Sequence, residues 1–130
     1  DPRSQEVADT LMARQRLFNR ARRQLTNPSH TAFIFVLTPE RLPILETRRA
    51  VASLQEHAIP VVGAVVNRVL PDAAEGPFFA ARHARQKAHM EELANALGSL
   101  PRKDVALQKD DIQGLEAIRQ FAGLLGNVDR

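Results

Sequence analysis

The sequence lacks several features by which protein classes are often identified. It contains no cysteine, which excludes disulfide bonds and thiolate metal sites. It contains no tyrosine or tryptophan and only six phenylalanines, whereas proteins that bind single-stranded nucleic acid usually offer several stacking rings. No apolar run approaches the ~18 residues of a membrane-spanning helix, and the polar first 20 residues do not resemble a signal peptide. We therefore expect a cytoplasmic protein that does not bind nucleic acid.

Nucleotide-binding and catalytic motifs are also missing. Neither GxxxxGK[ST] nor GxGxxG occurs, so no glycine-rich loop is present to hold phosphates. The four histidines are scattered, and neither a catalytic residue set nor a metal-ligand cluster is recognisable. The 130 residues, of which 44% are apolar, are enough for one domain or part of one. Because the chain begins with Asp1, we expect it to be processed or cut from a longer chain; its net charge of +3 favours anionic ligands in general.

Two apolar runs organise the rest of the chain. Residues 31–37 (TAFIFVL) and 60–67 (PVVGAVVN) are rich in β-branched and aromatic side chains, as expected of strands buried on both faces. Between them, apolar residues repeat at intervals of three and four, which predicts a helix with one buried face. This set comprises Ile44, Thr47, Val51, Leu54 and Ala58. The stretch therefore predicts a parallel β-α-β unit.

Similar patterns predict the remaining elements. We expect a first helix over residues 4–26 capped by Ser4, a third over 78–97 ended by Gly98, a short strand at 105–108, and a last helix capped by Asp110 or Asp111. The order α-β-α-β-α-β-α predicts a single α/β segment over residues 1–130, with a parallel sheet flanked by helices. The first helix carries a stripe of arginines, which is either a solvated face or a patch for anions or nucleic acid.

Polar residues follow both predicted strands, at the edge where ligands bind in open α/β sheets. The amide of Asn67 offers one donor and one acceptor, which match the N6/N7 edge of adenine, but an asparagine here can also simply close a turn. Glu40, after Pro39, could meet a cation, a ribose or a partner subunit, or be an ordinary surface glutamate.

The stretch TAFIFVLTPERLPILETRRAVASLQEHAIPVVGAVVNRVLPD resembles the arsenite-pump ATPase family, which includes the tail-anchored-protein-targeting ATPases. The shared pattern is a strand followed by PE, then ET-x-R, an IPV-like strand start and VVNRVLP. Further along the chain, Arg82-x-x-x-Gln86 resembles the R-x-x-x-Q helix of the family, and DDIQGLEAIRQFAGLL resembles its closing helix. The resemblance thus covers nearly the whole chain.

This resemblance implies the C-terminal part of a P-loop NTPase fold of the SIMIBI type, in a parent enzyme that hydrolyses ATP with Mg²⁺. The phosphate loop, the switch regions and the Mg²⁺ ligands of that family precede the part seen here. The resemblance implies cofactor-binding roles for Asn67, which would recognise adenine, for the neighbouring Arg68, and for Glu40, near nucleotide at the dimer interface. It also implies that Leu107 and Gln108 lie in the turn that covers the base, although Ala106 stands where the family usually has proline. No catalytic residue of this chain is implied.

The partners implied by the resemblance are ATP, a second subunit in a homo- or heterodimer, and a membrane-protein client or pump subunit. The targeting members bind zinc through CxxC before the R-x-x-x-Q helix, but this chain has Gly76 and Phe79 at that spacing, so zinc-bridged dimerisation is not implied. Two alternatives stay open: a stand-alone interaction module without enzymatic activity, and nucleic-acid binding through the arginine-rich first helix.

Overall fold

The computed structural model describes residues 1–126, which form four helices and a three-stranded sheet. In chain order the elements are α1 (Pro2–Thr26), β1 (Phe33–Leu37), α2 (Arg41–Glu56), β2 (Val61–Val69), α3 (Pro77–Leu97), β3 (Arg102–Ala106) and α4 (Gly114–Leu124). The strands lie in the order β1-β2-β3, and both pairs are parallel. This arrangement confirms the predicted α/β class and the predicted β-α-β unit.

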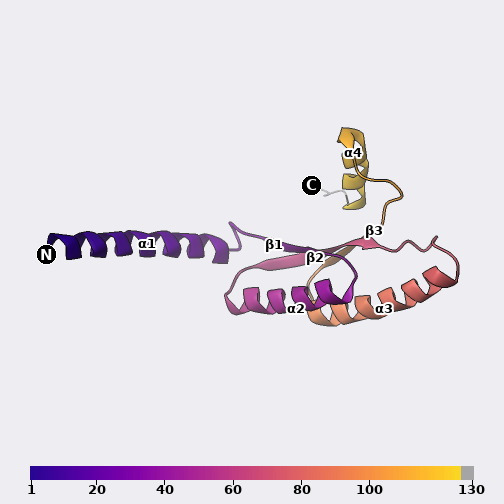
Figure 1. Cartoon of the computed structure of the whole chain (residues 1–130), viewed down its shortest axis with the longest axis horizontal. Helices are drawn as coiled ribbons and strands as arrows, with labels where there is room; N and C mark the ends of the chain where they lie inside the picture. The colour runs from indigo at the N-terminus through magenta and orange to yellow at the C-terminus, as the bar shows by residue number, and fades with distance from the viewer. Residues whose placement is uncertain (127–130) are drawn as a thin grey trace.

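The core lies between one face of the sheet and the layer formed by α2 and α3 (Figure 1). Ile44 and Val51 of α2 and Leu93 of α3 are buried against Leu37 and Val66 of the sheet. The opposite face, to which alternate residues of each strand point, is largely uncovered within residues 1–126, so the expectation that both faces are buried was wrong. Ile34 and Val36 of β1 are accordingly 54% and 70% exposed. The residues described here thus bury one face of the sheet.

The first helix stands clear of this core, as Figure 1 shows. None of its 25 residues is buried, and its large apolar side chains, such as Leu11 and Phe18, are exposed. Only its last turn is attached to the following loop, where the Thr31 hydroxyl donates to the Gln24 carbonyl at 2.7 Å. Phe18 and Leu25 of this helix line a hollow of about 440 Å³ together with Ile59, whereas Val7 and Leu11 nearer its start are exposed.

Three local expectations were wrong. The first helix is capped by Asp1, whose carboxylate accepts from the Arg3 N–H at 3.3 Å, rather than by Ser4, because a proline at position 2 favours an earlier start. The last strand spans 102–106 rather than 105–108, since charged residues such as Lys103 are tolerated on an edge strand. The last helix is not capped by Asp110 or Asp111; its N-cap is Gln113, and the left-handed φ of +80° at Gly114 prevents an earlier start.

Candidate functional site

The carboxyl ends of the three parallel strands meet at one edge of the sheet, and the predicted site residues lie there. Glu40 follows β1, Asn67 and Arg68 fall near the end of β2, and Leu107 and Gln108 follow β3 directly. The Leu107 N–H donates to the Val69 carbonyl at 2.8 Å, which holds the β3 exit against β2. The sheet therefore brings together residues that are up to 68 positions apart in the sequence, from Glu40 to Gln108.

A bulge in β2 sets the position of Asn67 and Arg68. Val66 pairs with Asp104 and Val69 with Ala106, so two residues of β2 oppose one residue of β3. Arg68 adopts φ +61°, a left-handed conformation that is uncommon for a residue other than glycine. Bulges of this kind are frequent beside active sites, where they redirect side chains. Nothing in the alternating pattern of the sequence predicts this bulge.

The amide of Asn67 is partly engaged by its own turn. Its Oδ1 atom accepts from the Arg68 N–H at 2.9 Å, a local bond of the kind expected from an asparagine that closes a turn. An amide oxygen has two lone pairs, so Oδ1 retains one acceptor position, and the Nδ2 group retains its donors. Both the turn-closing role and the adenine-reading role are compatible with this geometry.

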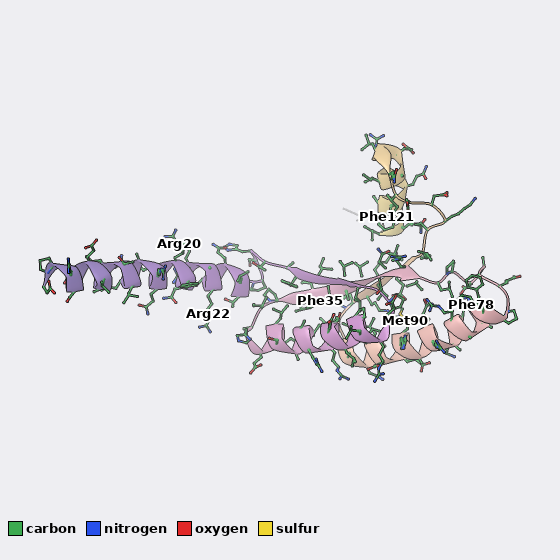
Figure 2. The ribbon with its side chains drawn as sticks, viewed as in Figure 1. Arg20, Arg22, Phe35, Phe78, Met90 and Phe121 are labelled. Atoms are coloured by element: carbon green, nitrogen blue, oxygen red, sulfur yellow. The ribbon has the colours of Figure 1, made fainter. Side chains whose placement is uncertain are left out.

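Four of the five predicted residues line one cavity of about 260 Å³. They are Asn67, Arg68, Leu107 and Gln108. Phe121 of α4, labelled in Figure 2, lines the same cavity, although sequence reasoning had not selected it. The amide of Gln108 is used locally, since its Nε2 donates to the Ala106 carbonyl at 2.7 Å. Asp110, Asp111 and Ile112 complete the lining. The cavity thus combines amide, guanidinium and carboxylate groups with the apolar groups of Leu107, Ile112 and Phe121.

The fifth residue, Glu40, lines an adjoining cavity of about 480 Å³. Arg68 and Leu107 line both cavities, so the two spaces are neighbours. The wall of the larger cavity opposite the strand ends is α3, which contributes Arg82 and Arg85. Arg82, Arg85 and Lys87 make the first half of this helix basic in the sequence, but no local pattern shows that it faces the strand exits.

Polar side chains of α3 fasten the helix to the loops around this second cavity. Gln86 Oε1 accepts from the Leu70 N–H at 2.7 Å, just beyond the end of β2. His89 Nδ1 lies 3.3 Å from the Pro39 carbonyl oxygen, beyond the end of β1. The Gln86 of the R-x-x-x-Q pattern therefore has a clear structural task in this chain. Within residues 1–126, no group of three or more histidine, aspartate or glutamate side chains is placed to hold a metal ion.

Comparison with known proteins adds to this geometry. The sequence model of a family described as anion-transporting ATPase matches residues 1–127. The chain belongs to this family. Its matches include a putative arsenical pump-driving ATPase 2 of Aquifex aeolicus, 31% identical over 93% of this chain and 40% of the relative. They also include a putative arsenical pump-driving ATPase of Halobacterium salinarum, 31% identical over 81% of this chain and 16% of the relative, and the ATPase GET3 of Scheffersomyces stipitis, 29% identical over 93% and 36%.

Membership in the anion-transporting ATPase family confirms the resemblance found in the sequence. The three-stranded parallel sheet with its helices is consistent with an α/β fragment of a P-loop NTPase of this family. The chain spans between 16% and 40% of the length of these three relatives. No helix within residues 1–126 is both long and apolar enough to cross a bilayer.

Proposed function

We propose that this segment supplies the adenine pocket and part of the dimer surface of an ATPase. The phosphate loop and the Mg²⁺ ligands of that enzyme would lie outside these 130 residues, in which no GxxxxGK[ST] motif occurs. The observation that carries the proposal is the cavity shared by Asn67, Leu107 and Phe121 at the carboxyl edge of a parallel sheet. This is the edge at which α/β proteins bind their ligands.

The chemistry of the cavity suits a purine base. The Asn67 amide can donate to N7 of adenine and accept from its N6–H group, whereas the O6 atom of guanine would face the amide oxygen and be repelled. Leu107 and Phe121 offer apolar surface to the faces of the ring. At about 260 Å³ the cavity is slightly smaller than the ~300–1,000 Å³ typical of complete small-molecule sites, as expected if it receives the base alone.

The dimer surface is the second part of the proposal. Glu40 is exposed, it follows β1 at the same edge, and it is the acidic side chain lining the larger cavity next to Arg68. An exposed carboxylate beside a nucleotide pocket is placed to accept hydrogen bonds from a ribose hydroxyl or a partner subunit. Relatives of this chain bear the names arsenical pump-driving ATPase and ATPase GET3, so a pump subunit is one partner that the complete ATPase would drive.

Nucleotide titrations of the complete ATPase test the adenine pocket. Asn67→Ala removes the paired contact, which is worth roughly 1–3 kcal/mol by analogy with asparagine reading adenine in DNA. ATP binding should therefore weaken by roughly 5- to 150-fold, with a much smaller effect on GTP. Asn19→Ala on the exposed face of α1 is the matched control and should change neither.

A second substitution separates the two roles of Asn67. Asn67→Asp keeps an oxygen that can accept from the Arg68 N–H but removes the donor to N7. If Asn67 reads adenine, the aspartate variant should lose ATP affinity as the alanine variant does. If the aspartate variant keeps its ATP affinity, or if both variants lose ATP and GTP equally, Asn67 only holds the turn and the proposal is wrong.

A further inference from the structure

The larger cavity carries an excess of fixed positive charge. Three arginines line it: Arg68 from the β2 bulge, and Arg82 and Arg85 from α3. The only carboxylate in its lining is Glu40, so the formal charge of these four groups is +2, against +3 for the whole chain. A guanidinium group is a positively charged donor without an acceptor, so three of them in one lining favour an anion.

These arginines have no ion-pair partner within residues 1–126. The salt bridges there involve Arg48, Arg102 and Arg119, all outside this cavity. Surface arginine side chains usually extend into solvent away from one another. Here three of them, from β2 and α3, line the same cavity. Converging unpaired guanidinium groups are the arrangement by which proteins bind phosphate groups, because each planar fork can donate two parallel hydrogen bonds.

The walls that carry the arginines are fixed in place. The bond from the Leu70 N–H to Gln86 ties α3 to the β2 exit, and the contact of His89 with the Pro39 carbonyl ties it to the β1 exit. Arg82 and Arg85 lie within one turn of Gln86 on the same helix. A ligand would therefore meet cations whose backbone is already positioned, which reduces the entropy lost on binding.

We propose that this cleft binds a small phosphate-bearing anion, held by Arg68, Arg82 and Arg85. The volume of about 480 Å³ accommodates a compact polyanion, and no aromatic ring lines it to stack a base. Two sources share this chemistry: a free anion such as pyrophosphate, or a phosphate group of a nucleotide bound in the neighbouring cavity. The proposal does not depend on Asn67 reading adenine.

Calorimetric titration of the 130-residue chain with sodium pyrophosphate, at constant ionic strength, tests the proposal. We expect saturable binding with a Kd of about 1 mM or tighter. Arg82→Gln with Arg85→Gln should weaken it at least about tenfold by removing charge-assisted hydrogen bonds. Glu40→Gln, which removes the opposing charge, should tighten it. Circular dichroism checks that each variant is folded.

A matched control removes the same charge elsewhere. Arg20→Gln with Arg23→Gln on α1 lowers the net charge by the same two units and should leave the Kd for pyrophosphate within about twofold. Equal weakening by the control pair would show diffuse attraction and overturn the proposal, as would the absence of saturable binding up to about 10 mM.

Titration in the presence of ATP distinguishes the two sources. If pyrophosphate still binds with ATP present, the cleft takes a free anion; if ATP displaces it, a nucleotide phosphate occupies the cleft. Both results support a phosphate site. Asn67→Ala should leave pyrophosphate binding unchanged, so failure of the adenine pocket and failure of this cleft give different results.

Discussion

Gly63 in the middle of β2 gives a sharp test of the packing between strands. A Cβ atom built there would lie 2.7 Å from the carbonyl oxygen of Pro101, the residue directly before β3. That oxygen already accepts the Ala64 N–H at 2.9 Å, so it cannot retreat without loss of a hydrogen bond that joins the strands. Gly63→Ala should therefore destabilise the protein even though it adds a single methyl group.

The magnitude follows from three terms. Relief of the overlap costs about 1–3 kcal/mol, as for other additions to a well-packed interior. Weakening of the bond between Ala64 and Pro101 costs about 0.5–1.5 kcal/mol. Replacing glycine recovers about 0.5–1 kcal/mol of backbone entropy. The net loss is about 0.5–4 kcal/mol, which for a chain of this size lowers Tm by roughly 2–20 °C.

The chain offers a matched control in Gly123 of α4. A Cβ there meets nothing within 4 Å, and alanine is the better helix former, so Gly123→Ala should be neutral or stabilise by up to about 1 kcal/mol. Differential scanning calorimetry of both variants gives the comparison. If the two variants have the same Tm, Pro101 does not approach β2 as closely as described.

Three further outcomes are expected. Ile44→Ala should lower the free energy of unfolding by about 2–5 kcal/mol because Ile44 is fully buried. Leu42→Ala in the same helix, at a site 64% exposed, should lower it by at most about 0.5 kcal/mol. Equal losses in denaturant titrations would contradict the burial of Ile44 in the core. Gln86→Ala should lower the free energy of unfolding by about 1–3 kcal/mol, because it leaves the half-buried Leu70 N–H unpaired, and Gln86→Glu should keep most of that stability. An unchanged hydrogen-exchange rate of the Leu70 amide in the alanine variant would argue against this hydrogen bond. The isolated chain should not hydrolyse ATP, and turnover near ~1 s⁻¹ that a substitution in this chain abolishes refutes this.

The sequence was most informative where hydrophobic periodicity is strong. The apolar runs at 31–37 and 60–67 and the helix between them appear close to the predicted bounds, because β-branched and aromatic runs and a repeat of three and four are strong local signals. The third strand was displaced, since only Val105 of its five residues is buried and the pattern there is weak. Capping was mispredicted at both terminal helices, where Pro2 and Gly114 outweigh the side chains of Ser4 and Asp110.

Sequence reasoning predicted that the candidate residues share one edge of the sheet, and the structure brings them to one edge; whether they bind a ligand stays a prediction. The rule that ligands bind beyond the strand ends selected Asn67 and Glu40, which the structure places at that edge. Phe121 and the arginines of α3 were not selected, because their approach depends on how whole helices pack rather than on local pattern. The R-x-x-x-Q resemblance and the basic first half of the helix both pointed to Arg82, but not to its position beside the strand exits. The roles of these residues remain predictions.

The exposure of α1 has a consequence for how unfolding of this protein is measured. A helix of 25 residues is about 37 Å long, and within residues 1–126 its neighbours from the rest of the fold lie along its C-terminal third. Its helicity therefore rests on local propensity, which changes gradually with temperature, while the sheet with α2 and α3 should melt cooperatively. A thermal melting curve recorded by far-ultraviolet circular dichroism sums the gradual loss of helix in α1 and the cooperative unfolding of the core, so its midpoint is the Tm of neither process. The calorimetric peak reports the cooperative unfolding of the core alone.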